Sequence, residues 1–422
     1  MFESKKDMGK VIVAGGGIIG LCTAYYLHKA GHEVCLIEKG DLQSGTSFGN
    51  AGYISPSHFI PLASPGIIAK GLQWMLSSSS PFYIKPRLDM DLIKWGLTFW
   101  KKSGRATMER NIPPMNEILQ LSRHLSSEIK NELGNTFRMA EDGCLMLYKN
   151  ASTEKHEIEM AEDAAKLGIE TRIYSAAEIQ AMEPDVEVNV RGGVLYPIDA
   201  HLHPGDFMQT LKQHLLDSGV SFQLNTEITG FERKGRRVTT VLTNNGSFSG
   251  DEVVLATGSW LNLSTRDLGI ELIMQAGKGY SMTFENVAKN LHYPSILVDD
   301  RVAMTPMAGD LRMGGTMEIS GLNSNVLIKR AEAIFKAAKS YFPNLPVSFP
   351  SKDKIWFGWR PLSPDGLPYI GRHSSYDNLI IAGGHAMLGI SMAAATGKIV
   401  EEITSGKQTS IDIGAFAVER FD

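Results

Sequence analysis

The sequence of 422 residues predicts an α/β chain, α+β overall, in which a Rossmann-like βαβ domain is interleaved with a second domain of antiparallel sheet plus helices. The first observation is a strand–turn–helix–strand pattern at the N-terminus. The second is that short apolar strand patterns recur over 253–256 and 379–382. The third is that 280–284 and 302–315 alternate in the manner of antiparallel sheet. A chain that returns twice to the first kind of pattern is expected to carry its second domain as insertions.

Composition excludes several classes of protein. Apolar residues make up 43% and charged residues 21%, and the net charge is −4. The chain is therefore not disordered, and it has no excess of Lys and Arg that would make nucleic acid its main partner. Its three cysteines, Cys22, Cys35 and Cys144, form no Cys-x-x-Cys pair and no disulfide framework. A reducing, cytoplasmic location fits this pattern.

Targeting and membrane signals are weak. Lys5, Lys6 and Lys10 precede the apolar run 11–26 as in a secretory signal, but glycines break the run and no small-residue cleavage site follows. No run of 18 apolar residues occurs. We expect the stretch 95–102 to be a helix packed on its own domain, although it contains two Trp and ends in two Lys. The alternative is a peripheral contact with the inner face of a membrane.

The N-terminal elements follow one another closely. A strand is expected over 11–14, a glycine turn over 15–20, a helix over 21–30 and a second strand over 34–37. The segment 41–66 is rich in Gly, Ser and Pro, so we expect a long functional loop.

The rest of the chain alternates helices with strands. The low-complexity patch Ser77–Ser80 predicts a loop between two helical segments. Ile118, Leu121, Leu125 and Ile129 lie on one helical face. Further helices are expected near 154–167 and over 204–216, 326–341 and 389–404, and further strands over 144–148, 193–196 and 222–224.

These elements predict two discontinuous domains. The nucleotide-binding domain is expected to comprise 8–85, 200–268 and 352–422. The substrate-binding domain, which includes a helical segment, is expected to comprise 86–199 and 269–351.

The glycine turn has the G-x-G-x-x-G pattern of a dinucleotide site, and its context between a strand and a helix makes the motif specific. Gly15 permits the tight turn, Gly17 lets a pyrophosphate approach, and Gly20 lets the helix pack on the sheet. Glu38 ends the second strand, where an acid accepts hydrogen bonds from ribose hydroxyls and disfavours NADP. The expected cofactor contacts in this unit are Gly15, Gly17, Ile18, Ile19, Gly20, Glu38 and Lys39.

Three further features favour FAD over NAD. Segments 227–229 and 253–258 resemble the adenosine-side elements of flavoproteins, and 46–52 places small polar groups where a ribityl chain would run. Gly383-Gly384-His385 precedes a helix start, whose positive end suits the negative charge of a reduced flavin. The expected contacts are Thr46, Ser47, Asn50, Ala51, Gly52, Ile228, Ala256, Thr257, Gly258, Trp260, Gly383, His385, Leu388, Gly389 and Ile390.

The sequence resembles the D-amino-acid oxidase superfamily of FAD-dependent oxidoreductases, and its D-amino-acid dehydrogenase branch most of all. The resemblance rests on motifs spread over nearly the whole chain: GGGIIG, TSFGNAGYISP, GGVLYP, ATGSW, GKGYS, RMGG, GWRPLSPDGLPYIG and GGHAMLGISMAAATG. It implies oxidation of an amino acid by hydride transfer from Cα to flavin N5, giving an imino acid that hydrolyses to a 2-oxo acid. Residues 1–8 extend past the usual start of the family.

We expect the FAD to be non-covalent, because the 46–52 loop contains neither Cys nor His. His58 lies just beyond that loop. No metal is expected: His201 and His203 precede a helix start at Pro204, with no third ligand at a standard spacing.

The resemblance implies that Arg360 pairs with the substrate carboxylate, for which a planar guanidinium suits better than Lys. Tyr280 is a second catalytic candidate, as a wall of the site or a hydroxyl donor, although core packing explains it equally well. Further candidates for substrate binding are Tyr53, His58, Arg301 and Met307.

Several alternatives stay open at this point. The substrate is expected to be a small D-amino acid, with a cyclic imino acid such as D-proline or D-hydroxyproline as the main alternative. An NAD-dependent dehydrogenase and a non-catalytic subunit that only holds a flavin are the rival classes. The residues do not establish the stereochemistry, the oligomeric state or the electron acceptor, for which a quinone, a respiratory partner and oxygen are the candidates.

Overall fold

The computed structural model describes residues 9–75 and 80–422. A six-stranded sheet has the order β19-β20-β13-β1-β2-β9, parallel except for the antiparallel pair β19–β20. Its strands are β1 (Lys10–Ala14), β2 (Glu33–Ile37), β9 (Ser221–Gln223), β13 (Glu252–Leu255), β19 (Tyr369–Arg372) and β20 (Leu379–Gly383). The N-terminal, middle and C-terminal parts of the chain thus meet in one sheet, as the recurring strand patterns predicted.

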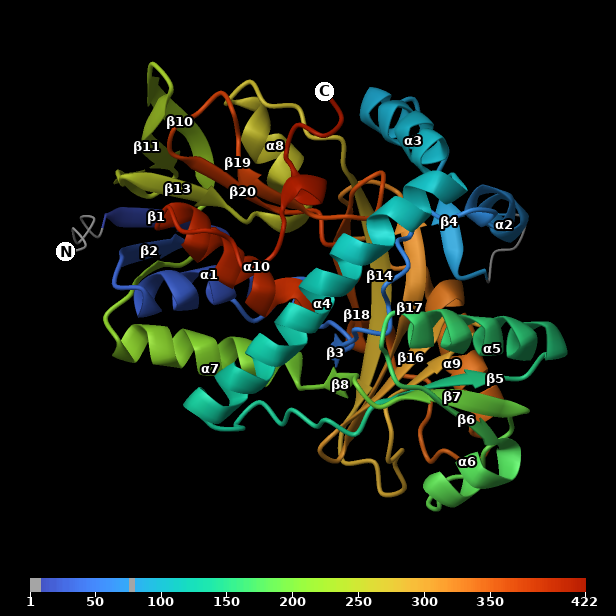
Figure 1. The fold of residues 1–422 in the computed structure, drawn as a ribbon. Helices are drawn as coiled ribbons and strands as arrows, with labels where there is room; N and C mark the ends of the chain where they lie inside the picture. The colour runs from blue at the N-terminus through green and yellow to red at the C-terminus, as the bar shows by residue number, and fades with distance from the viewer. Residues whose placement is uncertain (1–8, 76–79) are drawn as a thin grey trace.

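Four helices stack on one side of this sheet (Figure 1). They are α1 (Ile18–Lys29), α4 (Arg105–Leu133), α7 (Pro204–Asp217) and α10 (Gly389–Thr404). α10 packs between α1 and α4, so a helix from the end of the chain completes the core around the first βαβ unit. The opposite side is covered by α8 (Leu261–Arg266) and a small sheet of β10 (Ile228–Lys234), β11 (Arg237–Thr243) and β12 (Gly246–Phe248).

The second large sheet has nine strands and is mostly antiparallel. Its order is β18-β14-β17-β16-β15-β5-β7-β6, with β4 paired to β17. The strands are β4 (Phe82–Ile84), β5 (Cys144–Tyr148), β6 (Arg172–Ser175), β7 (Gly192–Tyr196), β14 (Gln275–Phe284), β15 (Ser295–Leu297), β16 (Val302–Met307), β17 (Asp310–Ile319) and β18 (Ile355–Leu362). The predicted sheet segment 302–315 is thus the hairpin of β16 and β17.

Helices cover both faces of this sheet because its strands are apolar on both. In β5, Leu145 and Leu147 pack in one core with α9 (Ile328–Tyr341), while Cys144 and Met146 pack in another with α5 (Ala151–Lys166). The remaining elements are α2 (Ile67–Met75), α3 (Met90–Lys102), α6 (Ala176–Met182), three short 3₁₀ turns, and a small sheet of β3 (Tyr53–Ile54) and β8 (Ala200–His201).

The sheets divide the chain differently from the predicted domains at three places. β18 and β4 both lie in the second sheet. The prediction had placed them in the nucleotide-binding domain, within 352–422 and 8–85 respectively. α4 packs on α10, although 86–199 was assigned to the substrate domain. The domain division as a whole stays a prediction.

Two predictions fall partly or wholly outside the described residues. Of the predicted Ser77–Ser80 loop, only Ser80 is described. Lys5 and Lys6, which were considered as part of a secretory signal, lie outside the described residues. Within 9–75 and 80–422, no helix has the length and apolar character needed to cross a membrane. All three cysteines are buried and unpaired.

Candidate active site

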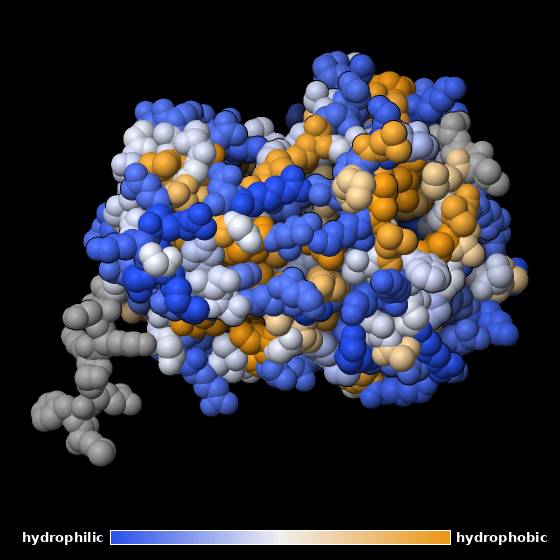
Figure 2. All heavy atoms as spheres, turned by 90° about the horizontal axis from the view of Figure 1, so that it is seen from above, coloured by the Kyte–Doolittle hydropathy of each residue, from blue (hydrophilic) through white to orange (hydrophobic). Residues whose placement is uncertain are grey.

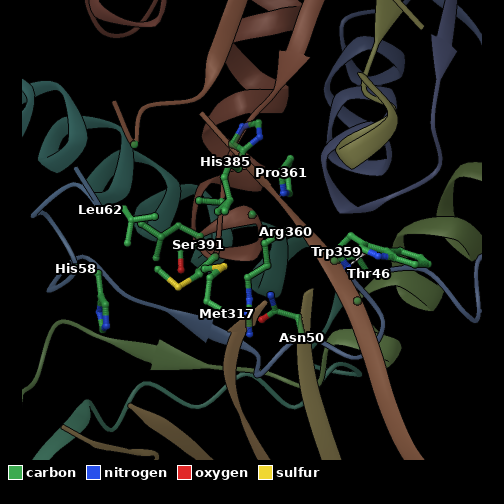
Figure 3. A pocket seen from close by; sticks show the side chains of 18 of the residues that line it. Thr46, Asn50, His58, Leu62, Met317, Trp359, Arg360, Pro361, His385 and Ser391 are labelled. Atoms are coloured by element: carbon green, nitrogen blue, oxygen red, sulfur yellow. Dashed lines mark hydrogen bonds between the residues drawn. The ribbon is translucent and has the colours of Figure 1, made fainter. Parts of the chain in front are cut away.

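A cavity of about 2290 Å³ lies between the two large sheets (Figure 3). This volume exceeds the roughly 300–1,000 Å³ of a typical ligand pocket, so it has room for a dinucleotide and a small substrate together. Most residues predicted from the sequence line it: Gly15, Gly17, Ile18, Ile19, Glu38, Lys39, Thr46, Ser47, Asn50, Ala51, Tyr53, His58, Ile228, Ala256, Thr257, Gly258, Trp260, Tyr280, Arg301, Arg360, Gly383, His385, Leu388, Gly389 and Ile390. Their individual roles stay predictions.

Three predicted residues lie outside the lining. Gly20 has the packing role expected for it, because a Cβ there would lie 1.8 Å from the carbonyl oxygen of Gly15. Gly52 was predicted to contact the cofactor, but its N–H donates to the side chain of Asn50 and its carbonyl accepts from Leu202. Met307 was predicted to line the pocket, but it is buried with its methyl group against Gly52. The last two predictions are therefore corrected, since both residues pack the loop 46–52 against β8 and β16.

The glycine turn has the shape that a pyrophosphate requires. Gly15 has φ +107°, and a Cβ there would lie 2.4 Å from the carbonyl oxygen of Ala256. Gly17, by contrast, faces open space, with only Ser47 Oγ near the position of a Cβ. Gly17 is the N-cap of α1 and has no side chain to cap the helix. The N–H of Ile18 donates to Ser47 Oγ, and the N–H groups of Gly17 and Ile19, two further cavity-lining residues, are left for a ligand. A phosphate fits this cradle.

Glu38 stands beside the turn at the end of β2. One carboxylate oxygen accepts from the N–H of Gly16 at 2.7 Å, and the other accepts from the N–H of Gly40 at 2.8 Å. Each oxygen keeps a free lone pair toward the cavity, which suits a pair of ribose hydroxyls. Lys39 lies over the ring of Trp260 at 3.1 Å, and burial lowers the pKa of Lys39. Lys39 and Trp260 line the cavity together with Glu38.

The loop 46–52 is fixed to both sheets. Ser47 Oγ accepts from the N–H of Ile18, and Thr46 Oγ1 accepts from the N–H of Trp359. From the second sheet, Arg312 donates to the carbonyl of Asn50 at 2.7 Å and to that of Phe48 at 3.2 Å. Arg312 lies in the RMGG motif, but no pattern in the sequence predicts a role for its side chain. A buried Arg that donates to loop carbonyls is a clamp, which only the fold reveals.

The C-terminal segment brings a second helix N-terminus to the cavity. α10 begins after Leu388 without a side-chain cap, and Leu388, Gly389 and Ile390 line the cavity. His385 is buried, its Nε2 lies 2.9 Å from Thr396 Oγ1, and burial lowers its pKa to about 3. His385 is therefore neutral at physiological pH, and the positive end of α10 is the charge that this segment offers to a flavin.

Taken together, these residues fit FAD. The glycine turn and the start of α1 would hold the pyrophosphate, Glu38 the ribose, and the loop 46–52 with the start of α10 the ribityl chain and flavin.

Arg360 projects from β18 into the cavity (Figure 3). Its guanidinium lies flat over Gly279 of β14, where a Cβ would come within 2.2–2.3 Å of the guanidinium atoms. It donates to the carbonyl of Thr316. That carbonyl is available because the register of β14 and β17 shifts between Lys278 and Tyr280, and Thr316 has φ +66°. Such a bulge commonly re-aims groups beside an active site.

The charge of Arg360 has no counter-ion. Burial lowers the pKa of Arg360 to about 10, and no carboxylate of the described residues offsets this effect. The side chain is still cationic at neutral pH, and a buried cation without a partner is costly. This position therefore suits a ligand with a negative charge.

Two tyrosines have their hydroxyls committed elsewhere. The Tyr280 hydroxyl donates to Glu318 at 2.5 Å and accepts from the N–H of Leu327, on the opposite face of β14 from Gly279. This corrects the prediction that Tyr280 offers a hydroxyl to the substrate. The Tyr53 hydroxyl lies within 2.9 Å of the carbonyls of Ser295 and Met304. Tyr53 therefore presents ring and backbone, not a free hydroxyl.

His58 lies across the pocket from Arg360 (Figure 3). Its Nδ1 is 3.1 Å from Ser57 Oγ, which donates to Asp199 at 2.5 Å. Burial raises the pKa of Asp199 to about 7 and lowers that of His58 to about 4. Asp199 is fully buried and anchors the 57–58 segment, because it accepts from both the N–H and the hydroxyl of Ser57. His203, considered as a metal ligand, accepts from the N–H of Asp206 and caps α7.

Comparisons with known proteins agree with this geometry. A family model described as "DAO: FAD dependent oxidoreductase" matches residues 10–403. A protein of Helicobacter pylori named D-amino acid dehydrogenase is 33% identical over 412 residues, which are 97% of this chain and 98% of that protein. A protein of the same name from Granulibacter bethesdensis is 32% identical over 429 residues, covering 98% of this chain and 99% of that protein.

Solved structures show the same fold. Glycine oxidase from Geobacillus kaustophilus superposes with a TM-score of 0.78 at 22% identity, covering 98% of this chain and 99% of the other. L-proline dehydrogenase from P. horikoshii superposes with a TM-score of 0.77 at 21% identity, covering 98% and 97%. At these identities the structures establish the architecture alone.

Proposed function

The chain belongs to the DAO family of FAD dependent oxidoreductases, and from that membership we propose that it oxidises a D-amino acid to the imino acid, which water hydrolyses to a 2-oxo acid and ammonium. Membership rules out the alternative of a dehydrogenase that uses NAD alone. When bound, FAD supplies the acceptor for the hydrogen and the two electrons that leave the substrate Cα.

Arg360 is the observation that carries the proposal. Arg360 is a cation without a counter-ion, fixed by the Thr316 carbonyl and by Gly279. It matches the carboxylate, the negative charge that every amino acid substrate carries at a fixed distance from Cα. A bidentate guanidinium–carboxylate pair would fix the position of Cα and the direction of its hydrogen. The protein's part in the reaction is then mainly orientation, which explains why the described cavity needs no strong acid–base pair.

The test is the product balance of purified holoenzyme with a dye as electron acceptor. D-alanine should give equal amounts of 2-oxo acid, ammonium and reduced dye, and L-alanine should give little. D-proline and hydroxy-D-proline belong in the same panel, because a cyclic imino acid is the alternative substrate. Turnover with no D-amino or imino acid would leave the non-catalytic, flavin-holding role instead.

We also propose that the surface of α2 and α3 rests on an anionic membrane. α3 packs inward through Trp95, whose indole N–H donates to the carbonyl of Leu362. In α3, the side chains of Met90, Ile93, Leu97 and Trp100 are each at least 43% exposed. Leu88, just before the helix, and Leu72 of α2 are exposed as well. Figure 2 shows apolar atoms gathered over this part of the molecule.

The charge around this surface supports the same proposal. Residues 67–110 contain eight Lys and Arg but only three Asp and Glu, in a chain whose net charge is −4. Apolar side chains in a basic surround suit the interface of an anionic bilayer. The holoenzyme should sediment with phosphatidylglycerol vesicles but not with phosphatidylcholine vesicles, and Leu97→Ser with Trp100→Ser should abolish sedimentation. Equal recovery with both vesicle types would refute a charge-dependent membrane contact.

A membrane location would favour a quinone or a respiratory partner over oxygen as electron acceptor. Peroxide should then form much more slowly than dye is reduced. Equal rates would make the protein an oxidase.

A further inference from the structure

The cavity extends beyond Arg360 across the second sheet. Arg360 reaches the carbonyl of Thr316 on β17, and the neighbouring strand is β16, about 4.8 Å further on. Arg301 directly precedes β16, and its carbonyl oxygen lies 3.3 Å from the position of a Cβ on Gly315. A substrate whose carboxylate is held at Arg360 therefore has Arg301 one strand away, along the same cavity wall.

The turn that carries Arg301 is fastened to α5. The Asp299 carboxylate accepts from the N–H of Lys149 at 2.8 Å, from Asn150 Nδ2 at 2.7 Å and from the Thr153 hydroxyl. Residues four apart on a helix share a face, so Glu157 projects on the same side of α5 as Thr153. Asp299 thereby sets Glu157 and Arg301 toward the same part of the cavity, which both line.

Both charged groups lack a partner. Glu157 is only 8% exposed, and no hydrogen bond or ion pair within the described residues involves its carboxylate. Arg301 is exposed to solvent, lies over the ring of Trp74 at 4.7 Å, and has φ +55°. Burial raises the pKa of Glu157 to about 7, and the charge of Arg301 partly offsets that effect. A buried carboxylate beside an unpaired guanidinium indicates a site for a further polar group.

The two charges together select the chemistry of that group. At a pH above the pKa of Glu157, where its carboxylate is ionised and where the ligand test below is made, an anionic side chain would be attracted by Arg301 but repelled by Glu157. A cationic side chain would meet the reverse. A neutral group that both donates and accepts hydrogen bonds satisfies both at once. A hydroxyl and a carboxamide have this property, whereas a methyl group satisfies neither.

We propose that Glu157 and Arg301 form the subsite for the substrate side chain, and that the preferred substrates are neutral amino or imino acids that end in a hydroxyl or a carboxamide. The inference rests on the proposed function, since it takes the carboxylate at Arg360 as the fixed end. Trp74 supplies an apolar wall beside the subsite.

Unreactive carboxylates test the subsite without turnover. Butyrate, 4-hydroxybutyrate, succinate and 4-aminobutyrate share the carboxylate and differ only at the far end. Their dissociation constants for the holoenzyme are measured by calorimetry and by the change in the flavin spectrum. A hydrogen bond to a charged group makes 4-hydroxybutyrate bind roughly 10-fold more tightly than butyrate. Succinate and 4-aminobutyrate should bind no better than butyrate.

Two variants assign the roles. Glu157→Gln should improve succinate binding roughly 10-fold and leave butyrate unchanged, because it removes the repelling charge. Arg301→Met should improve the binding of 4-aminobutyrate by a similar factor, because it removes the charge that repels the ammonium group. Glu159→Gln is the matched control, because Glu159 lies on the same helix, outside the cavity lining. Circular dichroism and flavin content show that each variant is folded and loaded.

The outcomes separate the subsite from the function. If both variants change the dissociation constants of all four ligands by one common factor, or change none of them, the proposed subsite is refuted. If the ligand pattern holds but no amino acid reduces the flavin, the subsite stands and the proposed reaction fails. With an active enzyme, D-glutamine should exceed the similarly shaped D-methionine in kcat/KM in the wild type, and Arg301→Met should remove that preference. An equal preference in the variant contradicts the proposal.

Discussion

Gly279→Ala perturbs the carboxylate site without touching Arg360 itself. A Cβ at this position would lie 2.2 Å from a guanidinium nitrogen, whereas ordinary contacts begin at 3.4 Å. The guanidinium must therefore move by about 1.2 Å, the difference between the two distances. A misplacement of about 1 Å at a reacting centre costs on the order of 100-fold in rate. We expect kcat/KM for D-alanine to fall by about that factor, with FAD still bound.

The assay compares three substitutions. Arg360→Lys keeps the charge but loses the fork, and a loss of about 3 kcal/mol corresponds to roughly 150-fold in kcat/KM. Gly104→Ala is the control, because a Cβ there meets nothing within 4 Å and Gly104 lies outside the cavity lining, so activity should not change. An amine without a carboxylate should react equally poorly with wild type and Gly279→Ala. If Gly279→Ala retains kcat/KM within about 3-fold, the guanidinium does not hold the carboxylate as described.

Three further predictions concern the cofactor and the buried acids. Glu38→Ala should weaken FAD binding by roughly 10- to 150-fold, since it removes charge-assisted hydrogen bonds of about 1.5–3 kcal/mol, and an unchanged affinity of the apoprotein would refute the ribose assignment. Acid precipitation should release all the flavin into the supernatant, whereas yellow protein in the pellet would indicate a covalent link. Asp199, with its pKa raised to about 7, binds a proton more tightly when folded, so its contribution to stability falls as the pH rises from 5 toward 8. Between pH 5 and pH 8, the free energy of unfolding of Asp199→Asn should therefore rise by about 2–3 kcal/mol relative to that of the wild type, as measured in denaturant titrations. If the difference between the two free energies stays constant over this range, Asp199 does not titrate there.

The nucleotide half of the site follows from the sequence because its signals are local. The glycine turn and Glu38 lie within one βαβ unit, so spacing alone brings them together. The return of β13 and β20 to the same sheet follows from their apolar patterns. The role of Arg360 was predicted from the family resemblance, but the residues that surround its guanidinium were not predicted.

The substrate half depends on contacts across strands that the sequence does not reveal. Arg360 is placed by Gly279 on a neighbouring strand and by a bulge at Thr316 on the next. Strand parity explains the error over Tyr280: successive residues point to opposite faces, so the Arg360 guanidinium packs on the Gly279 face of β14 and the Tyr280 hydroxyl bonds to Glu318 on the other. Glu157 and Arg301 are far apart in the sequence and line the same cavity, where Asp299 fastens the turn that carries Arg301 to α5.

Anaerobic mixing of the holoenzyme with D-alanine tests the central claim most directly, because a single turnover needs no external electron acceptor. The account predicts that the oxidised flavin absorbance disappears, that deuterium at Cα slows the loss, and that Arg360→Lys slows it further. A flavin that stays oxidised with every D-amino acid and cyclic imino acid tried, in protein that retains its FAD, would contradict it.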